Sequence, residues 1–130
     1  MGQPLPTGTV TLLFTDIEDS SRKWDENRSA MAQALVQLNT IVIGAIEAHG
    51  GAIVKDKGDG FFAAFGSPTD AVAGVLDAQR AIGGASWPDA TGTIKVRMAI
   101  HTGPLEPEDG DYRGPVVNRV ARLDVKQQGA

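Results

Sequence analysis

The chain contains no cysteine among its 130 residues. It therefore has no disulfide framework and no thiolate chemistry. No apolar run approaches the roughly 20 residues that cross a bilayer. The first residues lack the basic and apolar regions of a secretory signal, and Pro6 stands where an acylation pattern needs Ser or Thr. These absences predict a cytoplasmic domain that makes no contact with a membrane.

Basic residues are also scarce, with 12 Lys and Arg against 16 Asp and Glu, and the net charge is −4. Nucleic-acid binding normally needs a basic face, so we expect no nucleic-acid partner. A single nucleotide is not excluded, because a few placed cations and a metal ion bind it inside an acidic protein. The length and the 42% hydrophobic content suit one globular domain with one core.

The hydrophobic pattern predicts alternating strands and helices after a lead-in rich in Pro and Gly at residues 1–8. Ser67 and Pro68 have the chemistry of an N-cap and a first helical position, and Gly50 that of a helix end. We expect strands at residues 9–15, at 52–66 (two strands around a tight turn) and at 93–103, and helices at 20–49, 67–82 and 115–128.

This order is β-α-β-β-α-β, followed by a short arm and a further helix. It is typical of the ferredoxin-like or palm arrangement, an α+β fold with an antiparallel sheet and helices on one face. We expect residues 9–130 to form that domain.

Two carboxylates are predicted to meet at one edge of this sheet. Asp16 follows the apolar run of "VTLLFTDIEDSS", and Asp59 lies in the "KGDG" turn. Carboxylates held together need a shared proton or a divalent cation, and Mg²⁺ commonly takes one or two of them plus substrate phosphates. Two alternatives remain open. Asp59 suits an ordinary turn, and Asp16 or Asp19 suits a helix cap.

Four blocks of sequence carry a family resemblance: "LLFTDIEDSSR", "VKDKGDGFFAAF", "VRMAIHTGP" and "DYRGPVVNRVARL". In this order and spacing they resemble the catalytic domain of class III nucleotidyl cyclases, particularly actinobacterial adenylate cyclases, over residues 9–126. Four blocks together are more specific than any one motif. The resemblance implies conversion of ATP to cyclic AMP and pyrophosphate, or the equivalent reaction with GTP.

The resemblance also implies roles for individual residues. It makes Asp16, Asp59 and the backbone carbonyl of Ile17 ligands of two divalent cations, Mg²⁺ or Mn²⁺, with Ile17 also beside the substrate. Asn118 would orient the ribose, and Arg122 would contact the phosphate in the transition state, as an arginine finger does. The alternative for Asn118 and Arg122 is an exposed helix face.

In the same family pattern, Lys55 and Asp111 read the purine. Adenine offers an acceptor at N1 and a donor amine at N6, whereas guanine reverses both. Lys55 with Asp111 therefore favours ATP over GTP. Each residue has a simpler alternative: Lys55 as a solvated edge lysine, and Asp111 as a turn residue.

The family places its site between two subunits. Asp16 and Asp59 would lie on one surface, and the purine and transition-state residues on another. We therefore expect a head-to-tail homodimer with two sites. The segment "PLEPEDGDYRG" would be the arm that reaches the partner.

One departure from the family is apparent. The family usually continues beyond "VARLDVKQQGA" into a small C-terminal subdomain that supplies a Lys for the terminal phosphates, so the sequence resembles a C-terminally truncated domain. The main alternative function is a non-catalytic nucleotide-binding or dimerisation module, although such relatives should have lost the residues named above. A diguanylate cyclase needs a second acid in the "KGDGFF" turn, and a P-loop NTPase needs a Gly-rich motif that is absent.

Overall fold

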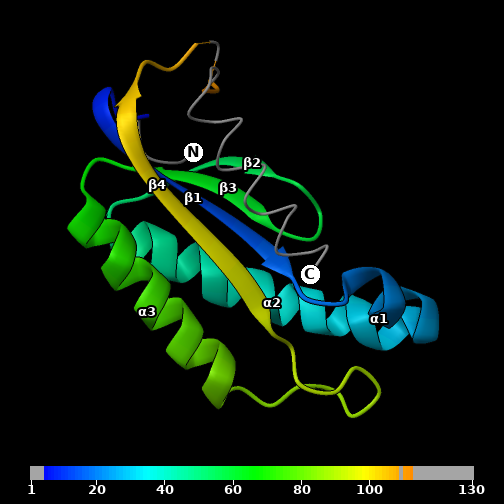
Figure 1. Ribbon diagram of the computed structural model, residues 1–130. Helices are drawn as coiled ribbons and strands as arrows, with labels where there is room; N and C mark the ends of the chain where they lie inside the picture. Colours follow the sequence, from blue (N-terminus) through cyan, green and yellow to red (C-terminus); the bar gives the residue numbers. More distant parts are fainter. Residues whose placement is uncertain (1–4, 109, 113–130) are drawn as a thin grey trace.

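The computed structural model describes residues 5–108 and 110–112. Four strands form one antiparallel sheet in the order β2-β3-β1-β4, and helices lie below it in Figure 1. This confirms the predicted α+β palm fold. The predicted helix at 115–128 lies outside the described residues. The elements are β1 (Gly8–Ile17), α1 (Ser20–Glu26), α2 (Arg28–Ala48), β2 (Ala52–Asp56), β3 (Phe61–Phe65), α3 (Pro68–Gly84) and β4 (Val96–Leu105).

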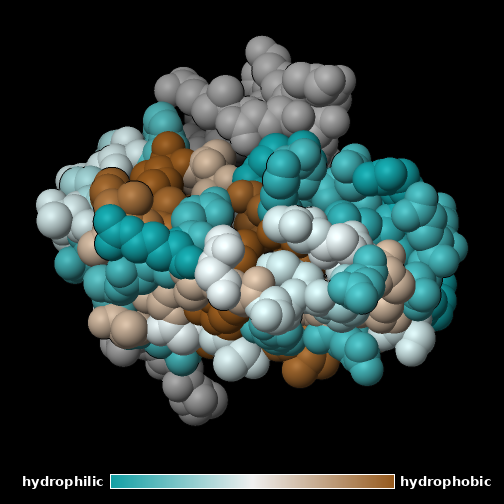
Figure 2. All heavy atoms as spheres, turned by 90° about the horizontal axis from the view of Figure 1, so that it is seen from below, coloured by the Kyte–Doolittle hydropathy of each residue, from teal (hydrophilic) through white to brown (hydrophobic). Residues whose placement is uncertain are grey.

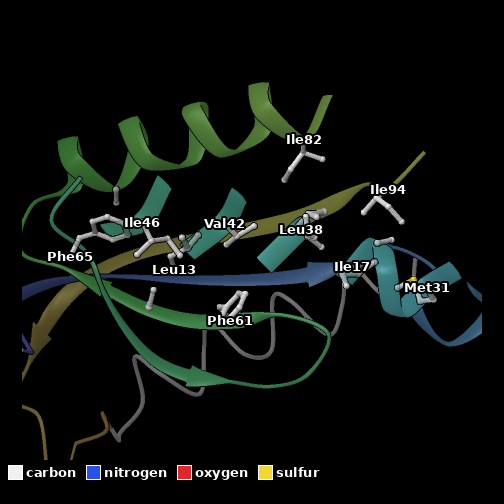
Figure 3. Close-up of a cluster of buried hydrophobic side chains, with 14 residues drawn as sticks. Leu13, Ile17, Met31, Leu38, Val42, Ile46, Phe61, Phe65, Ile82 and Ile94 are labelled. Atoms are coloured by element: carbon white, nitrogen blue, oxygen red, sulfur yellow. The ribbon is translucent and has the colours of Figure 1, made fainter. Parts of the chain in front are cut away.

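The central strand β1 is buried on both faces, as its unbroken apolar run predicts. Leu13 and Ile17 pack with α2 and α3 in the main core, shown in Figure 3. Leu12 and Phe14 point to the opposite face and pack in a second cluster. β1 pairs with β4 from Gly8 to Ile17 and with β3 from Thr11 to Phe14, so its central part is hydrogen-bonded on both sides.

Helix α2 presents one face to the sheet and is the core helix of the domain. Among the described helices it alone is long and apolar enough to cross a membrane by length and composition. Its buried side chains lie at three- and four-residue intervals, which is typical of a helix packed against a sheet. The buried residues of α2 are Met31, Ala34, Leu38, Val42 and Ile46.

The surface seen from below is largely hydrophilic, with separate hydrophobic patches (Figure 2).

The prediction of one continuous helix at residues 20–49 was wrong. Asn27 has an extended backbone (φ −158°), which ends α1 and begins α2. The Asn27 side chain accepts a hydrogen bond from the amide of Ala30 at 2.9 Å. This is ordinary N-cap chemistry, and Asn is among the preferred N-cap residues. The apolar periodicity continues across the break, so it did not reveal it.

The bounds of β1 and β4 also differ from the prediction. β1 runs on to Ile17, so Asp16 lies inside the strand rather than at its exit. β4 begins at Val96, although the expected start was residue 93. Ile94 precedes the strand and is nevertheless buried in the core. The prediction began the strand too early because Ile94 continues its apolar pattern, but a residue can be buried in the core without belonging to the sheet. At the start of α3, the expected Ser67 N-cap and Pro68 at the first helical turn are both confirmed.

Candidate active site

The turn between β2 and β3 is docked against the end of β1. The amide of Ile17 donates to the carbonyl of Asp59 at 3.0 Å, and the amide of Phe61 donates to the hydroxyl of Thr15 at 2.8 Å. Gly60 lies between these bonds, where a Cβ would stand 1.8 Å from the carbonyl oxygen of Thr15. Only glycine permits so close an approach. This contact fixes Asp59 beside the end of β1.

Asp16 forms a cross-strand ion pair with Arg97. The two residues are directly opposite in the β1–β4 ladder, and the guanidinium of Arg97 donates to Oδ2 of Asp16 at 2.8 Å. The Asp16 side chain is only 2% exposed and that of Arg97 is 24% exposed. A carboxylate this buried needs a cationic or hydrogen-bonding partner. Arg97 was not among the predicted site residues, although its place in the family block "VRMAIHTGP" was a usable signal.

Asp16, Ile17 and Asp59 line one cleft of about 340 Å³, together with Arg97 and the start of α1. The expectation that the two carboxylates face one space at the sheet edge therefore agrees with the fold. Carboxylate and carbonyl oxygens are the hard ligands that Mg²⁺ and Mn²⁺ prefer. Among the described residues, no cluster of three or more acidic, histidine or cysteine side chains could hold a metal ion. This donor set fits a cation that brings further ligands with its substrate, rather than one held by side chains alone.

The residues after Ile17 differ in part from their predicted roles. Asp19 stands at the N-cap position of α1 with a left-handed backbone (φ 58°), but its side chain makes no capping hydrogen bond and pairs with Arg22 instead. Backbone amides beside a predicted metal ligand are candidate donors to substrate phosphates. The amide of Glu18, however, donates to the carbonyl of Lys95 at 2.9 Å, and that of Ile17 donates to the carbonyl of Asp59. Neither amide is available to a phosphate.

Lys55 and Asp111 meet, although 56 positions separate them in the sequence. Lys55 lies on β2, just after an irregularity in its pairing with β3. Its ammonium lies 2.7 Å from Oδ2 of Asp111, in the arm that follows β4. Lys55 is 58% exposed and Asp111 is 21% exposed, so the pair is open to solvent on one side. The contact brings together the two residues that were predicted to read the purine, and that role stays a prediction.

Neither Lys55 nor Asp111 is among the residues that line the cleft of Asp16 and Asp59. Asn118 and Arg122 lie outside the described residues. The described part of the chain therefore places the predicted site residues in two separate groups: an acidic cleft, and a Lys–Asp pair on the β2 edge and the arm.

The comparisons with known proteins bear on the family and the fold of the chain. The family model "Adenylate and Guanylate cyclase catalytic domain" matches residues 3–124. An uncharacterized protein of Mycobacterium tuberculosis is 41% identical over 120 residues, which cover 91% of this chain and 39% of that protein. The adenylate cyclase of Lachancea kluyveri is 36% identical over 142 residues, which cover 91% of this chain and 8% of the enzyme.

A solved structure has the same fold. It is that of an adenylate cyclase from Trypanosoma brucei in its monomeric state, with a TM-score of 0.80 and 26% sequence identity. The match covers 90% of this chain and 68% of that one. Relative to the curated proteins above, the chain spans well under half of their length.

Proposed function

Because this chain belongs to the family of adenylate and guanylate cyclase catalytic domains, we propose that it converts ATP to 3′,5′-cyclic AMP and pyrophosphate. In this reaction the ribose 3′-hydroxyl gives up its proton to solvent and its oxygen bonds to the α-phosphorus. The bond from that phosphorus to the bridging oxygen breaks, and pyrophosphate leaves with that oxygen. The observation that carries the proposal is the presence of two half-sites on one fold: an acidic cleft suited to a metal-bound triphosphate, and a donor–acceptor pair suited to adenine.

The acidic cleft would hold the divalent cations. Asp16, Asp59 and the carbonyl of Ile17 are the proposed ligands. When bound, two cations favour the 3′-alkoxide and neutralise the triphosphate and the leaving pyrophosphate. Arg97 holds the carboxylate of Asp16 in its orientation before substrate arrives, and its positive charge at the cleft also favours an anionic substrate.

The Lys–Asp pair would select the base. Lys55 would donate to N1 of adenine, and Asp111 would accept from its N6 amine. The ion pair between them holds both groups at the correct edge before the nucleotide binds. Guanine presents a donor at N1 and an acceptor at O6, so each group would face a group of the same kind. We therefore propose ATP, rather than GTP, as the substrate.

The two half-sites favour a reaction site shared between two chains. In a head-to-tail homodimer, the acidic cleft of one chain would face the Lys–Asp pair of its partner, and symmetry would create two such sites. In this arrangement Asn118 would orient the ribose and Arg122 would stabilise the charge that develops on the α-phosphate. We also propose a cytoplasmic location without membrane contact, because α2 buries its apolar face in the core.

Complementation between inactive variants tests this proposal. With Mn²⁺ and ATP, Asp16→Ala and Arg122→Ala should each lose cyclic AMP formation, because each removes one half of every site. A mixture of the two should recover activity, up to about a quarter of the wild-type value for random pairing, since one site of the mixed dimer is intact. A mixture of Asp16→Ala and Asp59→Ala is the matched control and should stay inactive. Failure of the first mixture to recover would overturn the shared site.

The alternative function is a non-catalytic nucleotide-binding or dimerisation module. Thermal unfolding separates the two. A cation held jointly by two carboxylates and a triphosphate should raise the melting temperature with ATP much more than without it. A stabilisation by ATP that is unaffected by Mn²⁺, combined with no cyclic nucleotide product, would favour the non-catalytic module.

A further inference from the structure

Tyr112 anchors the end of the arm on the face of the sheet opposite to the helices. Its side chain is only 2% exposed and packs with Val10, Leu12 and Leu105 of the second cluster. The ring meets Phe62 of β3 edge-on, with centroids 6.3 Å apart. An aromatic ring buried in this way fixes the backbone that carries it.

The hydroxyl of Tyr112 makes one long-range hydrogen bond. It donates to the carbonyl of Pro6 at 2.6 Å, 106 residues away in the sequence. Pro6 belongs to the segment that leads into β1, and the neighbouring Leu5 packs in the same cluster. Burial, and secondarily the charge of Glu106, raise the pKa of Tyr112 to about 12. The phenol therefore remains a donor throughout the physiological range.

Asp111 precedes Tyr112 directly and is held from several sides. Two backbone hydrogen bonds with Glu108 close a tight turn around it. Its Oδ1 accepts from the amide of Tyr112 at 2.8 Å, and its Oδ2 pairs with Lys55 at 2.7 Å. The orientation of this carboxylate thus depends on where the backbone of Tyr112 is held.

We propose that Tyr112 is a positioning residue for nucleotide selection, which fastens Asp111 against Lys55 through its bond to the carbonyl of Pro6. The proposal rests on the proposed function, because the pair selects a nucleotide only if this domain is a cyclase. The segment that enters β1 is linked through a single hydroxyl to the purine-reading carboxylate, so a displacement of that segment changes the choice between ATP and GTP.

Two changes test the link, separately and together. Tyr112→Phe keeps the ring and removes the hydroxyl. A chain that starts at Thr7 keeps Tyr112 and removes its acceptor. Each should raise the KM for ATP about 3- to 10-fold, the effect of one lost hydrogen bond, and lower the ratio of kcat/KM for ATP to that for GTP, while kcat changes less. The combined variant should match the shortened chain, because both changes break the same bond.

Thr102→Val is the matched control. It removes a hydroxyl that bonds Thr11 at 2.8 Å between β1 and β4. In the strand register, Thr11 and Thr102 alternate with the residues that pack against Tyr112 and so face the helices. This variant should lose a similar amount of stability but keep the wild-type nucleotide preference. A merely structural role for Tyr112 would make the two variants indistinguishable in that preference, and that result would overturn the proposal.

A spectroscopic measurement tests the bond without activity. Tyr112 is the one tyrosine in the sequence, so phenolate absorbance during alkaline titration reports on it alone. Starting the chain at Thr7 removes Leu5 and Pro6 and so exposes the phenol to water, which should lower its midpoint towards the ordinary value near 10. An unchanged midpoint would mean that the segment of Pro6 does not cover Tyr112, and it would overturn the link. If the wild-type chain forms cyclic AMP and the Tyr112→Phe variant has the same preference for ATP over GTP, this inference alone is overturned. If the wild-type chain neither binds nor converts nucleotide, the proposed function is overturned as well.

Discussion

Arg97 lies directly opposite Asp16 in the β1–β4 ladder and binds its carboxylate at 2.8 Å within the cleft that Asp59 also lines. The guanidinium therefore supplies positive charge at the place where a divalent cation is proposed to bind. Asp16 is almost fully buried, so its charge needs such a partner whenever no cation is present.

Loss of Arg97 should destabilise the domain and make it responsive to cations. Arg97→Ala leaves the Asp16 carboxylate buried without its counter-charge, which costs about 3 kcal/mol of unfolding free energy. Urea denaturation would measure this loss. Mn²⁺ alone should then raise the melting temperature of the variant more than that of the wild type, because the cation replaces the lost charge.

Arg22→Ala is the control for this change. Arg22 also pairs with an aspartate, Asp19, but both side chains are more than half exposed. Such surface pairs contribute about 0–1 kcal/mol. Equal destabilisation by the two variants would contradict the view that burial of Asp16 makes the Arg97 pair important.

A methyl group at Gly60 should displace the turn that carries Asp59. In Gly60→Ala the new Cβ would collide with the carbonyl of Thr15, at 1.8 Å. We expect a loss of about 3 kcal/mol or more in stability, and weaker binding of ATP with Mn²⁺, measured by denaturation and by calorimetry. Gly83→Ala, at the end of α3, has no heavy atom within 4 Å and should be neutral or stabilise by up to about 1 kcal/mol. If the two variants behave alike, the docked turn does not position Asp59.

Exchange of the charges in the purine pair should change the product. Lys55→Glu combined with Asp111→Lys keeps an ion pair but offers an acceptor where Lys55 donated and a donor where Asp111 accepted. Guanine then has the complementary groups, so the ratio of cyclic GMP to cyclic AMP should rise at least tenfold, measured by chromatography. Each single exchange places two like charges together and should lower both activities. A double variant that still prefers ATP would show that the pair does not read the base.

Stability should fall at high pH because of Tyr112. The fold raises the pKa of its phenol from 10.0 to about 12, mainly by burial. Between these values the folded chain keeps the proton while the unfolded chain loses it. The contribution of Tyr112 to the free energy of unfolding is therefore complete below pH 10 and is lost as the pH rises through about 12. Unfolding free energies measured across this range should decline less steeply in Tyr112→Phe. Identical slopes would mean that Tyr112 is not held as the fold indicates.

Several local features were predictable because neighbouring residues decide them. The Ser67–Pro68 start of α3 and the turn between β2 and β3 follow from cap and turn chemistry that acts within a few residues. The break at Asn27 has the same kind of signal, but the apolar periodicity continues across it and favours one helix. Where two local signals disagree, the one that also satisfies the backbone hydrogen bonds prevails.

The sequence by itself determined the succession of strands and helices along the chain, apart from the break at Asn27, and the doubly buried β1, because apolar pattern and turn chemistry are properties of contiguous residues. The predicted ligands also come from contiguous motifs, and their roles stay predictions. Tertiary structure alone decided that Arg97 binds Asp16, that Gly60 admits the Thr15 carbonyl, and that Tyr112 ties Asp111 to Pro6. These contacts join residues 45 to 106 positions apart. Their existence depends on strand register and on the exact approach of two backbones, which neither propensity nor periodicity encodes.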